Sequence, residues 1–172
     1  MNLLPLPKKF DENEWLIVAS ILLLFLLLNK LPKRFPNSIT VLLLVFTVAL
    51  SRVVDHTLAG PDINFYDIMD SGSFEFFDIF CYITYAPFGY LFIYIYDKYK
   101  LRGLRLFIYL ISVAIFSTLF EILTSSSYIH FFNYHSWKPL YSLPVYLIVQ
   151  PLTILFFHLI QYFYKKSIHL PK

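Results

Sequence analysis

The chain has 172 residues, of which 58% are hydrophobic and 20% aromatic, and its mean hydropathy is +0.63. This composition excludes an ordinary soluble domain. The net charge of +3 does not indicate nucleic-acid binding, because the basic residues stand beside apolar stretches, where membrane proteins carry them. The single cysteine, Cys81, excludes an intramolecular disulfide and a cysteine-based metal cluster.

Five apolar stretches follow one another along the chain, and a helix needs roughly 20 apolar residues to cross a bilayer. The first predicted span covers about 14–29. The basic residues that follow it are typical of a stop-transfer flank and offer no signal-peptide cleavage site. Because this span is apolar all round, we expect a retained helix that faces lipid at the edge of the bundle.

The second predicted span, about 39–58, ends at a loop of turn residues and acids. The third covers about 74–96 and contains Pro87, which predicts a kink, and the fourth covers about 106–124. An aromatic segment with Trp137 then predicts an interfacial stretch before the fifth span, about 142–164. The expected fold is therefore a single all-α domain over 1–172, a bundle of five transmembrane helices.

Lysine and arginine are distributed unevenly between the two sides of this predicted bundle. Ten lie after the first, third and fifth spans, and three lie on the other side. Because cytoplasmic loops of membrane proteins carry an excess of positive charge, this bias predicts an N-terminus outside and a C-terminus in the cytoplasm. The acidic loop between the second and third spans then faces outward.

Ionisable residues inside the spans give the strongest indication of a site, because a charge near the bilayer centre costs roughly 2.5–3.5 kcal/mol on insertion scales. The second span contains Arg52, Asp55 and His56, the third begins beside Asp78, and the fourth contains Glu121. Under the predicted topology all five lie at one level in the outer third of the membrane. Polar stripes on the last four spans predict a polar core that opens outward, with the first helix peripheral.

Two interpretations of this polar cluster stay open. Arg52 can pair with the carboxylates in a purely structural network, in which hydroxyl groups satisfy one another. Alternatively, the cluster forms a binding pocket or a proton-handling site open to the outside. The charge balance favours the second interpretation slightly, because three carboxylates face one arginine and one histidine, and a cation or a retained proton must balance them.

The outer loop carries oxygen ligands of the kind that calcium prefers, namely Asp62, Asp67, Asp70 and Glu75. Their spacing does not match a helix–loop–helix calcium site, and a solvated loop that caps the next helix is the simpler alternative. Zinc would require His56, His130 or His135, which lack a ligand motif. We expect no cofactor, with a divalent cation as the open alternative.

Short motifs from Leu31 onward occur together, in the same order, in one family. They include Leu31–Phe35, Tyr66–Asp70, Phe74–Asp78, Ala86–Tyr90, Tyr94–Lys98, Phe120–Glu121 and Tyr146–Gln150. On these motifs the chain resembles a family of small uncharacterised multi-spanning membrane proteins found mainly in spore-forming Gram-positive bacteria. It departs from that family at Ser136, where glycine usually precedes the tryptophan. The resemblance implies a multi-pass protein of a bacterial cytoplasmic membrane and supplies no activity.

These observations favour a non-enzymatic accessory or sensor protein with an outward-facing polar pocket. Its expected partners are the bilayer, a membrane protein or a second copy of the chain, and no nucleic acid. A small ion-coupled transporter is the first alternative, although the chain shows no repeated halves. A membrane-embedded enzyme that acts on a lipid or an envelope precursor has the least support, because the sequence contains no catalytic motif.

Overall fold

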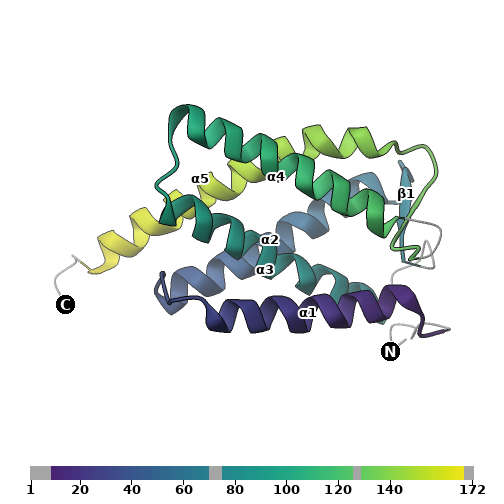
Figure 1. Cartoon of the computed structure of the whole chain (residues 1–172), viewed down its shortest axis with the longest axis horizontal. Coiled ribbons are helices and arrows are strands. Elements are labelled where there is room, and N and C mark those ends of the chain that lie inside the picture. Colours follow the sequence, from purple (N-terminus) through teal and green to yellow (C-terminus); the bar gives the residue numbers. More distant parts are fainter. Residues whose placement is uncertain (1–8, 70–74, 126–128, 169–172) are drawn as a thin grey trace.

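The computed structural model of this chain describes residues 9–69, 75–125 and 129–168. Its long helices are α1 (Glu12–Lys30), α2 (Asn37–Leu58), α3 (Phe76–Lys98), α4 (Gly103–Thr124) and α5 (Ser142–Ile168), shown in Figure 1. All five are long and apolar enough to cross a membrane. The prediction of five such helices is confirmed, and each predicted span overlaps its helix.

The outer surface of the bundle is apolar. Leu23 on α1, Val45 on α2, Phe116 on α4 and Leu155 on α5 are each more than half exposed, at 69%, 59%, 63% and 66%. An exposed apolar surface of this extent would make a soluble protein aggregate, whereas hydrocarbon chains cover it at no cost. The surface therefore suits a multi-pass membrane protein.

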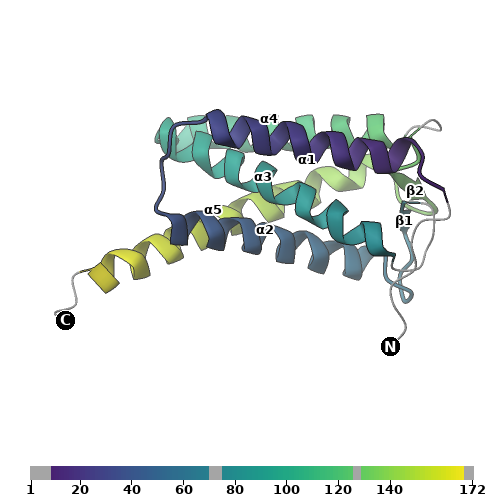
Figure 2. The ribbon, with the colours of Figure 1, turned by 90° about the horizontal axis from the view of Figure 1, so that it is seen from below.

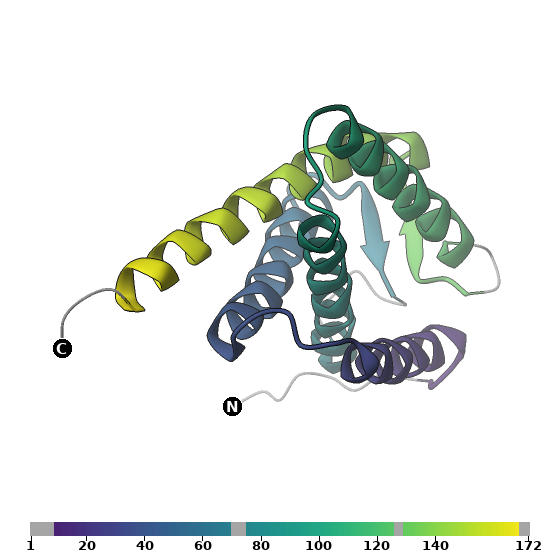
Figure 3. The same ribbon diagram turned by 60° about the vertical axis from the view of Figure 1, so that its left-hand side comes forward.

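Helix α3 lies at the centre of the bundle and packs against α1, α2 and α5. It approaches α2 most closely at Gly89, where a Cβ atom would collide with the side chain of Thr47. Helix α4 packs along α5 (Figure 3). It contacts α3 through aromatic side chains, because the ring of Tyr109 stacks on Phe92, with centroids 5.2 Å apart, and its hydroxyl donates to Phe92 O at 3.0 Å.

Two short strands lie outside the helices and tie two distant loops together. β1 (Tyr66–Ile68) follows α2, and β2 (Phe132–Tyr134) follows α4; they pair antiparallel, with Tyr66 opposite Tyr134. Figure 2 shows both strands at the end of the bundle where α1 begins. We call this pair the ribbon and this end the ribbon end.

The ribbon corrects the expectation of an all-α chain. The aromatic segment before α5 was predicted as an interfacial stretch, and it contains β2 and a short 3₁₀ helix, η1 (Pro139–Tyr141). The ribbon was missed because each strand has three residues and its partner lies more than sixty positions away. Hydrophobic periodicity cannot indicate a strand that short.

Candidate ligand-binding cavity

A cavity of about 380 Å³ lies inside the bundle, and residues from all five long helices line it. On α4 the lining extends from Tyr109 to Thr124, and the twelve residue steps from Tyr109 to Glu121 correspond to about 18 Å at a helical rise of about 1.5 Å per residue. Cavities of roughly 300–1,000 Å³ are the usual size for small-molecule sites. The cavity is thus elongated and runs from the ribbon end toward the opposite end.

Glu121 on α4 lines the cavity at the ribbon end and is only 7% exposed. Its Oε1 accepts hydrogen bonds from the hydroxyls of Tyr134 at 2.7 Å and Ser142 at 2.6 Å. Its Oε2 accepts one from Tyr146 at 2.9 Å. Three donors from β2 and the start of α5 therefore hold this carboxylate in place, and hydrogen bonds to a charged acceptor are about twice as strong as neutral ones.

The Glu121 network continues to Trp137, which the sequence predicted to be an interfacial aromatic residue. The indole Nε1–H of Trp137 donates to Ser142 Oγ at 2.9 Å. The ring of Trp137 also contacts the rings of Phe65, Tyr66 and Tyr141, with centroids 5.6–5.7 Å apart. Trp137 thereby joins the ribbon to the start of α5 and lines the cavity.

Asp55 on α2 is the second acid of the cavity lining and is 8% exposed. Its Oδ1 accepts a hydrogen bond from the Tyr66 hydroxyl at 2.7 Å, whereas its buried Oδ2 has no hydrogen-bond partner in the described part of the chain. Burial, and then the nearby charge of Asp55, raise the pKa of Tyr66, so this phenol remains a donor. Buried acceptors without a hydrogen-bond partner are uncommon in folded proteins, so this oxygen is a candidate contact for a ligand.

Of the five predicted cluster residues, the structure brings only Asp55 and Glu121 to the cavity. His56 is exposed and lies outside the lining. Successive helical residues are rotated by about 100°, so His56 cannot share the inward direction of its neighbour. Arg52 donates Nη1–H to the Tyr82 hydroxyl at 3.0 Å and lies over that ring.

The fifth member, Asp78, acts at the start of a helix. Its Oδ2 accepts the backbone N–H of Glu75 at 2.8 Å, as expected of a capping box at the first turn of α3. Glu75, which the sequence placed among the loop cation ligands, is the residue that precedes this helix. Both acids are thereby accounted for by the local geometry of α3.

Of the remaining outer-loop acids, the described Asp62 and Asp67 do not belong to a group of metal ligands. Asp62 is exposed, and Asp67 on β1 pairs with Nε2 of His135 at 2.8 Å. Asp70 lies outside the described residues. Across the described ranges, no three His, Cys, Asp or Glu side chains are placed to hold a metal ion.

The part of the cavity farther from the ribbon end is lined by apolar side chains and by a few polar ones whose hydrogen bonds are made within the protein. The hydroxyls of Thr47, Thr84 and Thr153 donate to carbonyl groups of their own helices. With its amide correctly oriented, Gln150 donates to Leu110 O at 2.9 Å and accepts from Ala114 N at 3.1 Å. These polar groups are satisfied by the protein and present little hydrogen-bonding capacity to a ligand.

Helix α1 contributes to the cavity, contrary to the expectation that it faces only lipid. Leu16, Ile17 and Ser20 line the cavity, and Ile17 is fully buried against the loop residues Met69 and Phe131. This buried face was not predictable from the sequence, because a helix that is apolar all round has no periodic pattern to mark its buried side.

Comparison with known proteins adds no relative. No family model matches the chain, and neither a curated protein nor a solved structure does.

Proposed function

We propose that this protein is a non-enzymatic sensor or accessory protein of a cell membrane, which binds a small lipophilic ligand in the cavity between its helices. The observation that carries the proposal is Asp55, a cavity-lining acid with one buried oxygen that has no partner among the described residues. A structural network would have satisfied this oxygen, as the Glu121 network satisfies its carboxylate.

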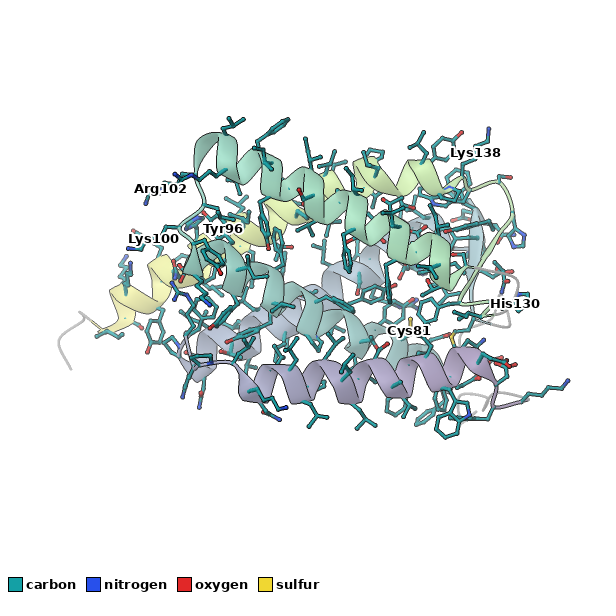
Figure 4. All side chains as sticks on the ribbon, in the orientation of Figure 1. Cys81, Tyr96, Lys100, Arg102, His130 and Lys138 are labelled. Atoms are coloured by element: carbon teal, nitrogen blue, oxygen red, sulfur yellow. The ribbon has the colours of Figure 1, made fainter. Side chains whose placement is uncertain are left out.

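The distribution of charge supports an orientation with the ribbon end outside. Lys100 and Arg102 lie at the end of the bundle away from the ribbon, and His130 and Lys138 lie at the ribbon end (Figure 4). The loop between α1 and α2 and the end of α5 add further lysines and an arginine to the first group. The excess of positive charge marks the cytoplasmic side.

An enzymatic role loses its main support from the same geometry. His56, the only histidine of the predicted polar cluster, is exposed and does not line the cavity. General acid–base catalysis needs the donor or acceptor within hydrogen-bond reach of the reacting group.

An ion-coupled transporter is the second candidate, and two features favour it. Pro87 and Pro151 lie inside α3 and α5, both of which line the cavity, and proline-containing helices can bend. Oδ2 of Asp55, which has no hydrogen-bond partner among the described residues, could also contact a transported cation. Proteoliposome flux that Glu121→Gln abolishes would place transport ahead of sensing.

Binding can be tested by filling the cavity. We expect Ser117→Phe, which adds a ring to the cavity lining, to reduce photo-crosslinking of a diazirine-labelled alkyl chain by about tenfold or more in nanodiscs. Tenfold corresponds to about 1.4 kcal/mol of binding free energy. Ser112→Phe is the matched control, because Ser112 lies on the same helix, exposed and off the cavity. Equal labelling of both variants would contradict the proposed binding site.

A further inference from the structure

We infer that the ligand is a single-chain amphiphile with a cationic amine head, which binds with its head beside Asp55 and Glu121 and its tail along the cavity toward Tyr109. The ligand enters from the bilayer between α1 and α4. This inference rests on the proposed binding function and names its ligand class.

The charge of the cavity favours a cationic head. Among the described residues that line it, only Asp55 and Glu121 carry a formal charge, and both are acids. Arg52 interacts electrostatically with Asp55, but its Nη1–H donates to the Tyr82 hydroxyl and it does not line the cavity. Two acids in a low-dielectric enclosure attract a cation and repel an anion.

The hydrogen bonding favours a head that donates. As a carboxylate, Asp55 has an oxygen without a donor, and as a neutral acid it would have a hydroxyl without an acceptor among the described residues. An ammonium group supplies N–H donors and a balancing charge together.

The surroundings favour an organic cation over a metal ion. Calcium takes six to eight oxygen ligands, whereas the described residues offer no group of three acids or histidines for a metal. Rings of Tyr66, Phe131 and Trp137 line the same end of the cavity. Aromatic faces attract an ammonium group within about 6 Å of the ring centre.

The deeper part of the cavity suits an alkyl tail. Its threonines and Gln150 are hydrogen-bonded within the protein, and its length along α4 is about 18 Å at the usual helical rise. A tail that moves from the bilayer into this apolar part stays out of water, so it avoids the cost of exposing its methylenes, about 0.8 kcal/mol each. A chain can therefore bind along the cavity while its head stays at the acids.

An opening toward lipid explains how such a ligand arrives. Phe116 and Phe120 on α4 line the cavity and are also 63% and 42% exposed, so the cavity wall and the lipid-facing surface meet there. Helix α1 lines the cavity from the other side and does not pack against α4 (Figure 3). Phe120 also contacts Phe88 of α3, with ring centroids 6.2 Å apart, so aromatic side chains partly cover the opening.

The test compares three competitors of equal chain length. The full chain in phosphatidylcholine nanodiscs is photo-crosslinked with a dodecylamine that carries a diazirine in its tail, and unlabelled dodecylamine, dodecanol or dodecanoate competes. We expect dodecylamine to compete at least about tenfold better than dodecanol, because a hydrogen bond to a charged group contributes about 1.5–3 kcal/mol. Dodecanoate should be the weakest, and octylamine should be weaker than dodecylamine.

Asp55→Asn then identifies the counter-ion. It keeps the acceptor for Tyr66 and removes the charge, so it should weaken dodecylamine by about tenfold and leave dodecanol unchanged. Asp62→Asn, in the exposed loop, is the matched control. If Asp55→Asn does not fold, the ranking of the three competitors on the unmodified protein decides.

The outcomes separate the inference from the proposed function. If dodecanol or dodecanoate competes as well as dodecylamine, the inference of a cationic head is wrong, whereas the proposal of binding in the cavity stands. If labelling by every probe is equal in Ser117→Phe and Ser112→Phe, the binding function fails as well.

Discussion

The two buried acids of the cavity, Glu121 and Asp55, differ at the residue scale in the number of hydrogen bonds that they accept. Glu121 accepts three hydroxyl hydrogen bonds, whereas Asp55 accepts one, from Tyr66. Both positions were predictable from the sequence, because charged residues within apolar spans are costly and face inward. Their donors Tyr66 and Tyr134 were not predictable, since they come from loops whose pairing depends on the folded bundle.

Removing the donors one at a time should show this difference. Tyr66→Phe leaves Asp55 without its donor, and we expect a loss of about 1–3 kcal/mol in unfolding free energy, the cost of an unsatisfied buried polar group. Tyr134→Phe leaves Glu121 with two donors and should cost less. Thermal unfolding in detergent, followed by circular dichroism, measures both. A larger loss of unfolding free energy for Tyr134→Phe than for Tyr66→Phe would contradict the expectation that Asp55 depends on its single donor.

At the scale of elements, the helices follow from apolar length and the ribbon does not follow from any local pattern. Each helix is a long apolar run that begins or ends at turn or charged residues, which is why five were predicted. Phe132–Tyr134 forms a strand because Tyr66–Ile68 lies beside it at the same end of the bundle. The inward face of α1 and the outward direction of His56 depend on packing in the same way.

The register of the ribbon can be tested by a designed disulfide. Asp67 lies opposite Asn133, so Asp67→Cys with Asn133→Cys should form a disulfide on mild oxidation. Cys81, the native cysteine, is fully buried and should not interfere. Mobility on a non-reducing gel, after cleavage between the two positions, detects the bond. Asp67→Cys with Lys138→Cys is the control outside the ribbon, and equal yields from both pairs would contradict the register.

At the scale of the whole molecule, the exposed apolar surface and the distribution of charge both fit a helical bundle that crosses a membrane. The lipid-facing surfaces are apolar, and basic residues concentrate at the end away from the ribbon, as Lys100 and Arg102 show in Figure 4. The resemblance to the family of spore-forming bacteria stays a prediction, as does the orientation. The number of spans was predictable because membrane thickness sets a minimum apolar length.

The orientation has a direct test in intact cells. Asp62→Cys, in the exposed loop at the ribbon end, should react with a membrane-impermeant maleimide added outside. Lys100→Cys, exposed in the loop between α3 and α4, should react only after the cells are broken. Labelling of the Lys100→Cys variant in intact cells, with protection of the Asp62→Cys variant, would invert the proposed topology.

The pairing of β1 with β2 also sets an order of events during synthesis. Residues of α1 to α4 precede β2 in the chain, so the ribosome synthesises all four helices before Tyr134. Until then Tyr66 has no strand partner, and Glu121 lacks its donors from β2 and α5. Because membrane helices insert first and associate afterwards, the cavity is completed only after α5 has been synthesised and has packed against the earlier helices.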